Sequence, residues 1–269
     1  MKLGIVIPVY HANGLHADFT RQTVESITSK DHNLKLYLIV NYSAKGLRPT
    51  TFSTKVPMGI TVVDNPKGNH VGTAWNMGIK MALAEGMEYV IVANNDLIFH
   101  ENCVDNLVDF AQRHLRFIMW TASQWDSLRT IKTILGSSFN DSFDEHPHFS
   151  CFMVNNRLIK KVGWFDENLS VAYMEDGDMH YRIILSGNKA GKTNRAKFYH
   201  YGSRTIKVDE DLYSKNVRTY EANRDYIRRK WNTDFHQKAY HPPEMILKEK
   251  GIYKTPFDKK EKGWNWMSW

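Results

Sequence analysis

The sequence is poor in cysteine and has no long apolar run. Its two cysteines, Cys103 and Cys151, lack the paired spacing of a metal or redox motif and the density of a disulfide scaffold. We therefore expect both to be reduced, buried thiols. No stretch approaches the ~18 consecutive apolar residues needed to span a bilayer, and the opening "MKLGIVIPVYHANG" is too short in apolar residues for a signal-peptide core. These absences predict a cytoplasmic protein.

Internal repeats and low-complexity segments are also absent from the sequence. The 269 residues are 42% hydrophobic and 24% charged, which is typical of a folded globular protein and leaves room for one large α/β domain with an extension. The net charge of +7 favours encounter with polyanions, among them nucleic acids, anionic membranes and nucleotide sugars. Charge alone does not choose between these partners.

Apolar runs alternate with segments of helical periodicity along the first hundred residues. The patterns predict strands over residues 2–10, 34–42, 60–65 and 88–96, and helices over 19–29 and 73–86. Gly86 is placed to cap the second helix at its C-terminus. Strands that alternate with helices are typical of βαβ units, so we expect an α/β fold with a mainly parallel central sheet flanked by helices.

Two polar clusters interrupt this pattern. The first is "NND", where the apolar strand that ends at Ala93 meets Asn94, Asn95 and Asp96. Asn and Asp are common turn formers, so the tripeptide alone predicts only a turn. A carboxylate at the carboxyl end of a parallel strand, however, lies where α/β folds bind their ligands.

The second cluster is "EDGD", which places Glu175, Asp176 and Asp178 directly before a helical segment. Acidic residues at a helix N-terminus often serve only as a cap, but three carboxylates in four residues exceed that need. Close carboxylates raise one another's pKa, which suits one of them to act as a base, and Arg182 could hold another ionised.

His200 follows a short aromatic run in "FYHYGS". A lone histidine is more often structural than a ligand. It becomes a candidate only if the fold brings it to Asp96, because an oxygen-rich site with one imidazole suits Mn²⁺ or Mg²⁺.

Taken in order, "IVIPVY", "NHVGTAWNMGI", "NND", "GWFDE", "EDGDMHYR" and "YHYGS" resemble the motifs of family 2 glycosyltransferases, which have the GT-A fold. The resemblance runs from about Lys2 to Trp231, where "NRDYIRRKW" is similar to the closing helix of that family. It implies an inverting hexosyl- or pentosyltransferase that uses a nucleoside-diphosphate sugar.

The resemblance also implies roles for individual residues. Asp96 would contact the divalent cation that bridges the diphosphate, with Asn94 as a weaker partner and His200 completing the site. Asp176 would be the general base, and Glu175 and Asp178 would orient the acceptor or Arg182. The residues expected to form the nucleotide-binding site are Pro8, Val9, Tyr10, Asn41, Asn69, Gly72, Asn76, Gly78, Asn94 and Asn95.

Two positions depart from the family pattern. The second strand of such enzymes commonly ends in an aspartate that recognises the base, whereas this chain has Asn41, which leaves the base of the donor open. The first position of the metal motif is Asn94, although an amide oxygen can still ligate a hard cation.

Alternatives and partners remain open at the level of sequence. A sugar nucleotidyltransferase would normally carry a Gly-rich, basic loop after the first strand, which "PVYHANGLH" lacks; a catalytically inactive glycan- or nucleic-acid-binding module is the other alternative. The acceptor could be a glycan, a lipid, a protein, a small molecule or a hydroxylated base in DNA. We expect residues 1–239 to form the catalytic domain, and the basic, aromatic extension 240–269 to pack on its catalytic face.

Overall fold

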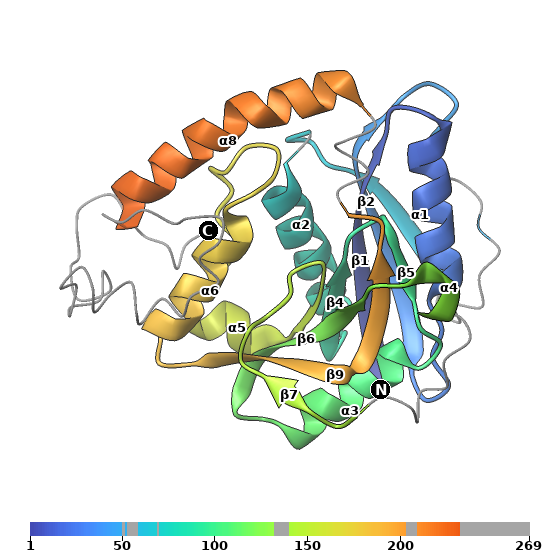
Figure 1. Ribbon diagram of the computed structural model, residues 1–269, viewed down its shortest axis with the longest axis vertical. Coiled ribbons are helices and arrows are strands. Elements are labelled where there is room, and N and C mark those ends of the chain that lie inside the picture. The colour runs from blue at the N-terminus through green and yellow to red at the C-terminus, as the bar shows by residue number, and fades with distance from the viewer. Residues whose placement is uncertain (50–51, 53–58, 69, 132–139, 203–208, 232–269) are drawn as a thin grey trace.

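The computed structural model describes residues 1–49, 52, 59–68, 70–131, 140–202 and 209–231 (Figure 1). Its strands are β1 (Lys2–His11), β2 (Asn33–Ser43), β3 (Ile60–Asp64), β4 (Tyr89–Ala93), β5 (Leu97–Phe99), β6 (Phe117–Trp125), β7 (Phe143–Asp144), β8 (Cys151–Val154) and β9 (Lys189–His200). Its helices are α1 (Gly14–Ser26), α2 (Val71–Ala84), α3 (Cys103–Arg113), α4 (Leu128–Ile131), α5 (Asn156–Lys161), α6 (Glu175–Leu185) and α8 (Glu210–Trp231). None of the helices in these ranges is long and apolar enough to cross a membrane.

The strands form one mixed sheet in the order β3-β2-β1-β4-β8-β6-β9-β5, with β7 paired to β9. Neighbours among β3, β2, β1 and β4 are parallel, β8 runs antiparallel to both β4 and β6, and β6 is parallel to β9. It follows that β1, β2, β3, β4, β6 and β9 point one way, while β5, β7 and β8 point the other. The carboxyl ends of the first group therefore meet at one edge of the sheet.

Helices cover both faces of this sheet (Figure 1). Alternate residues of β1 point to opposite faces, as a pleated strand requires: Ile5 and Ile7 join a core with α1 and α3, and Val6 joins a core with α2, α5 and α6. Both faces of β1 are thus buried, which explains why its sequence is a continuous apolar run rather than an alternating one.

The elements predicted from periodicity are present. The four strands match β1 to β4, and the two helices match α1 and α2. Gly86 adopts a left-handed φ of 79° just beyond α2, and its N–H donates to the Leu83 carbonyl, which confirms it as the cap. Cys103 and Cys151 are free and buried, as expected. The predicted boundary at residue 239, and the tail with Trp264, Trp266 and Trp269, lie outside the described residues.

Candidate functional site

Polar side chains gather at the edge of the sheet where β1, β2, β4 and β9 end. Tyr10, Asn41, Asn94 and His200 all lie at or directly beyond the carboxyl end of one of these strands. The amino end of α2 belongs to the same region, because His70 forms a parallel bridge with Val171 in the loop before α6. In open α/β sheets, ligands bind beyond the carboxyl ends of the strands.

Asp96 and His200 come together at this edge, although 104 positions of sequence separate them. Antiparallel pairing of β5 with β9 sets Leu97 opposite His200 and so brings the two side chains into contact. The Asp96 Oδ1 atom lies 3.0 Å from the His200 Nε2 atom, and the two side chains are only 3% and 12% exposed. This convergence is the condition under which His200 becomes a candidate metal ligand.

The pair fits a hard divalent cation. The 3.0 Å separation suits an ion pair, yet the buried Nε2 atom has no partner in hydrogen-bond geometry among the described atoms. About 3 Å is also the separation of two adjacent ligands in an octahedral site with bonds of about 2.1 Å. Within the described ranges, no group of three or more His, Cys, Asp or Glu side chains could hold a metal. Among the described residues, Asp96 and His200 are therefore the two side chains of these types that come together here as candidate ligands.

The other two residues of the "NND" turn are held by hydrogen bonds to neighbouring segments. The Asn95 amide donates to the Thr20 hydroxyl of α1 at 3.1 Å, and the same hydroxyl lies 2.8 Å from the Nε2 atom of His11 in β1. The Asn94 N–H donates to the Ser150 carbonyl at 2.9 Å. Asn95 is buried and Asn94 is partly exposed, so Asn94 is the more accessible of the two amides.

At the end of β1, Pro8 and Val9 are buried and Tyr10 is partly exposed. The pairing of β1 with β2 skips one residue here, from Val9 opposite Val40 to Tyr10 opposite Tyr42, so Asn41 forms a bulge.

The Asn41 side chain is fixed by a neighbour that sequence reasoning missed. Its Oδ1 atom accepts a hydrogen bond of 2.8 Å from the Asn65 amide, which also donates to the Gly68 carbonyl. Only the turn-forming letters "DNPKG" could have pointed to Asn65.

The first turns of α2 pack against the segment that leads to α6. A Cβ atom on Gly72 would lie 3.3 Å from the Asp166 carbonyl oxygen, so glycine permits this close approach. The Asn76 amide accepts from the Phe165 N–H and donates to the Phe165 carbonyl, at 2.9 and 2.8 Å. A Cβ atom on Gly78 would lie 2.3 Å from the Val6 side chain, so this glycine serves helix–strand packing. Asn69 lies outside the described residues.

The three carboxylates at the start of α6 have three different environments. Asp178 is fully buried, and it binds the Arg182 Nε atom at 2.9 Å and the Lys230 Nζ atom at 2.7 Å. Burial alone would raise the pKa of Asp178, but Lys230 and Arg182 lower it below its usual value. Asp178 is therefore an ionised anchor that also orients Arg182.

Glu175 is buried too, but no described residue forms an ion pair with it. Burial, and then the neighbouring Asp176 charge, raise the pKa of Glu175 to about 8, so this carboxyl group carries a proton at neutral pH. Asp176 is partly exposed, and its Oδ1 atom accepts a hydrogen bond from the Gly177 N–H at 2.7 Å. Of the three, Asp176 is the side chain that reaches solvent.

Helix α8 extends along the segment before α6 (Figure 1). The Asn223 side chain bonds to the backbone of residues 170–173, and Lys230 bonds to Asp166 and Asp178. At its other end, α8 is capped by Asp209, which accepts a hydrogen bond from the Tyr10 hydroxyl at 3.3 Å. Sequence reasoning missed these contacts, because a polar residue in a charged helix predicts only a solvated face.

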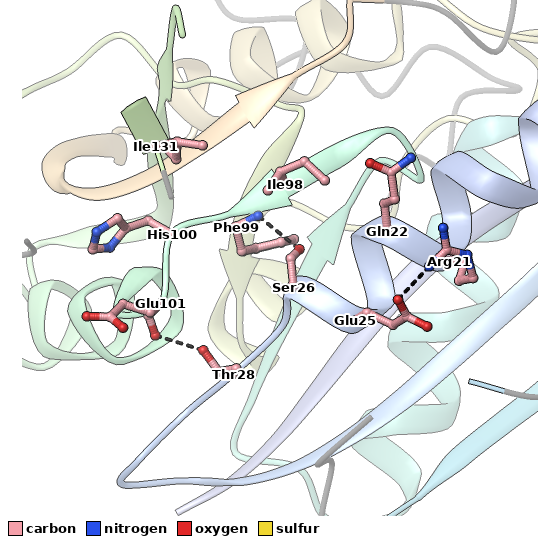
Figure 2. Close-up of a pocket in the computed structure, with 10 residues that line it drawn as sticks. All are labelled: Arg21, Gln22, Glu25, Ser26, Thr28, Ile98, Phe99, His100, Glu101 and Ile131. Carbon is pink, nitrogen blue, oxygen red and sulfur yellow. Dashed lines mark hydrogen bonds and ion pairs between the residues drawn. The ribbon is translucent and has the colours of Figure 1, made fainter. Parts of the chain in front are cut away.

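A separate cavity of about 550 Å³ opens between α1 and β5 (Figure 2). Two of its polar side chains bind within the cavity wall: Arg21 pairs with Glu25 at 2.7 Å, and the Thr28 hydroxyl donates to the backbone carbonyl of Glu101 at 2.9 Å. None of the predicted site residues lines this cavity. The candidate site is therefore the edge of the sheet rather than this cavity.

Residues 4–160 match the model of glycosyl transferase family 2. No curated protein sequence matches the chain.

Several solved structures share the fold at low sequence identity. GalNAc-T7 with UDP, GalNAc and Mn²⁺ is 14% identical with a TM-score of 0.57, over 84% of this chain and 50% of that chain. TarS 1–349 from S. aureus is 12% identical with a TM-score of 0.60, over 98% and 76% of the two chains. The mannosyltransferase PcManGT from Pyrobaculum calidifontis, in complex with GDP-Man and Mn²⁺, is 13% identical with a TM-score of 0.55, over 93% and 69%. The chain spans half the length of the GalNAc-T7 chain, and the expected GT-A fold is confirmed.

Proposed function

The chain belongs to glycosyl transferase family 2, and we propose that it moves a sugar from a nucleoside-diphosphate sugar to an acceptor hydroxyl with inversion at the anomeric carbon. One observation carries the proposal. The Asp96–His200 pair lies at the edge of the sheet where the amino end of α2 is bridged to the loop before α6, and at the start of α6 Asp176 is the partly exposed carboxylate beside a buried Glu175 whose pKa is raised. A cation site and a single accessible base are what such a displacement needs.

The metal and the donor are inferred from chemistry and from two matched structures, which contain Mn²⁺ with UDP or with GDP-Man. Asp96 and His200 would hold the cation, Mn²⁺ or Mg²⁺, and Asn94 is the nearby amide with access to solvent. When bound, the cation stabilises the negative charge that develops on the leaving diphosphate. Tyr10, Asn41 and the first turn of α2 are the groups available to the nucleotide.

Asp176 acts as the general base. As the acceptor oxygen bonds to the anomeric carbon, its proton passes to the Asp176 carboxylate, and the bond to the diphosphate breaks with its electron pair leaving on the phosphate oxygen. Glu175 already carries a proton and Asp178 is held in two ion pairs, so neither is as well placed to accept this proton.

The test separates the two acidic sites with a panel of UDP- and GDP-sugars and Mn²⁺, with water as the acceptor. We expect the wild type to hydrolyse at least one donor. Asp176→Asn should lower the hydrolysis rate by roughly 10²–10⁴-fold and leave donor affinity unchanged, because an amide cannot accept the proton. Asp96→Ala should weaken donor binding and turnover together, and His200→Ala should do the same to a smaller degree. Calorimetric titration of donor with Mn²⁺ supplies the affinities.

An exposed carboxylate on α8, Asp225, provides the control, because Asp225→Asn removes one charge far along the chain from both clusters. Near-native turnover in Asp176→Asn would move the base to Glu175. Normal donor binding by Asp96→Ala would show that "NND" is only a turn and not part of a metal site. Neither binding nor hydrolysis of any donor by the wild type would overturn the transferase proposal.

A further inference from the structure

The loop before α6 holds three non-glycine residues in the left-handed backbone region. Val171, Tyr173 and Met174 have φ values of 59°, 77° and 80°. This region is unfavourable for residues with a Cβ atom, above all for a β-branched valine, so the surrounding structure must hold the loop in place. Met174 is also the N-cap residue of α6, and Asp176 follows two positions later. The loop backbone therefore sets where the Asp176 carboxylate points.

One side chain of α8 bonds to this loop through its whole amide group. The Asn223 Oδ1 atom accepts from the Ser170 N–H at 2.9 Å. Its Nδ2 atom donates to the carbonyl oxygens of Ser170, Ala172 and Tyr173 at 2.9, 3.3 and 3.2 Å. Asn223 is only 3% exposed, so water does not compete effectively for these bonds. The Asn223 amide is therefore bonded to the backbone of residues 170, 172 and 173, the stretch that contains the left-handed residues Val171 and Tyr173.

Helix α8 is attached to the domain by other contacts as well. Its last turn binds Asp178 through Lys230 and Trp231, at 2.7 and 2.8 Å. Tyr226 donates to Asp166 at 2.8 Å, upstream of the left-handed residues. Attachment of α8 to the domain therefore does not depend on Asn223 alone. The hydrogen bonds of the Asn223 amide act locally, on the loop before α6.

The geometry points to Asn223 as a positioning residue for the proposed base, acting through the backbone of residues 170–174. It touches no reacting atom in this arrangement. The inference rests on the proposed function of Asp176. It adds that the base is held in position by α8, a helix that begins 34 residues after it. A base moved by about 1 Å loses up to roughly 100-fold in rate, so the effect on turnover should be large.

We call the four hydrogen bonds between the Asn223 amide and the backbone of residues 170–173 the clamp. Two substitutions disrupt it in different ways. Asn223→Ala removes every bond, whereas Asn223→Asp keeps the shape and the acceptor but turns a carboxylate oxygen toward the Ala172 and Tyr173 carbonyl oxygens. With the donor that the wild type hydrolyses in the panel above, both should lower kcat by about 10- to 100-fold, with donor affinity unchanged in titration. Tyr226→Phe removes a polar contact between α8 and the same segment and serves as the matched control; its kcat should stay within about twofold of wild type.

The double variant decides whether Asn223 acts through the base. When Asp176→Asn is already present, adding Asn223→Ala should change the remaining rate by less than about twofold, because the group that is being positioned has gone. Independent, multiplying losses would overturn the inference and leave the proposed function intact. A wild-type rate in Asp176→Asn would instead refute the assignment of the base, on which the inference rests.

A second measurement needs no turnover. Amide hydrogen exchange should become at least about tenfold faster over residues 170–176 in Asn223→Ala, and stay at the wild-type rate in the core of the sheet and in Tyr226→Phe. Unchanged exchange over residues 170–176 would show that the loop keeps its backbone without the clamp, and would overturn the inference even if activity fell.

Discussion

At the scale of single residues, the acidic cluster of α6 shows how different surroundings give three carboxyl groups different roles. The sequence predicted that three close carboxylates would differ in pKa, but it could not say which one would be neutral. That outcome depends on the arrival of Lys230 beside Asp178 and on the burial of Glu175, whose Cβ atom lies near the space that Gly72 leaves open. These contacts join positions far apart in sequence.

The raised pKa of Glu175 predicts a dependence of stability on pH. Its folded-state pKa, about 8, lies above the ordinary value of 4.5, so between these values the folded protein binds more protons than the unfolded chain. Stability from this group must therefore fall as pH rises through that window. Glu175→Gln keeps the shape without the charge, so its thermal midpoint should fall less between pH 5 and pH 8. Each unit of pKa shift that is removed corresponds to about 1.4 kcal/mol.

Thermal unfolding of both proteins across that pH range checks this. Glu25→Gln is a suitable control, because this partly exposed glutamate forms a surface ion pair with Arg21. Parallel midpoint curves for wild type and Glu175→Gln would show that Glu175 ionises normally in the folded protein.

At the scale of elements, the four parallel strands β1 to β4 were readable from sequence, and the later strands were not. Strands β1 to β4 are apolar runs separated by turns and helices, and that alternation fixes their direction. The segments "LIF" and "CFMV" are equally apolar, but nothing local says that β5 and β8 run the other way. Their direction is set by partners elsewhere in the chain, and the meeting of Asp96 with His200 depends on it.

The packing of helix α8 likewise could not be predicted from its own residues. Its residue pattern predicts a helix, and the helix is present, but the contacts of Asn223 and Lys230 join positions about 50 apart. Its buried residues are three apolar or aromatic ones, Leu212, Ile227 and Trp231, and two polar ones, Asn216 and Asn223. Part of its attachment is therefore polar, and a hydrophobic pattern cannot reveal that part.

The buried ion pairs of Asp178 predict a large loss when the carboxylate is removed. Asp178→Ala leaves the Arg182 side chain, 2% exposed, without the anion it binds among the described residues, and leaves the Lys230 side chain, 6% exposed, with its Asp166 pair alone. Removing one partner of a buried pair typically costs about 3–5 kcal/mol, and chemical denaturation at pH 7 should show a loss of that size. Hydrogen exchange should also become faster in the last turn of α8.

The pH dependence has the opposite sign to that of Glu175. Because the pKa of Asp178 is lowered in the folded state, its stabilising effect is present above the ordinary value of 3.8 and disappears as pH falls through the folded-state value. The difference between wild type and Asp178→Ala should therefore shrink in acid. Asp225→Ala breaks an exposed pair on the same helix and should leave stability unchanged. An equally small change in Asp178→Ala would show that the buried pairs contribute little.

At the scale of the whole molecule, one edge of the sheet collects groups from both halves of the chain. The N-terminal half supplies Tyr10, Asn41 and Asp96, the C-terminal half supplies His200, and in the proposed function Asp176 joins them from the start of α6. The motifs in sequence order pointed to these candidate residues, because each follows a strand or opens a helix. Their relative placement required the topology, in particular the insertion of β8 between β4 and β6, which keeps β9 pointing toward the edge where β4 ends.

A site assembled from both halves should stabilise the whole domain when it is filled. A ligand that binds only the folded protein adds about 2.7 kcal/mol at 100 times its dissociation constant, which corresponds to a rise of roughly 5–10 °C in the thermal midpoint of a domain of this size. We expect UDP or GDP to give such a rise, and to give more of it with Mn²⁺ than without. In Asp96→Ala the additional Mn²⁺-dependent part should disappear, because the carboxylate that would link metal to protein has been removed. In Asp176→Asn it should persist, because the base does not hold the metal. Equal shifts with and without Mn²⁺ in the wild type would mean that the nucleotide binds without a metal, and no shift with any nucleoside diphosphate would mean that this edge is not a nucleotide site.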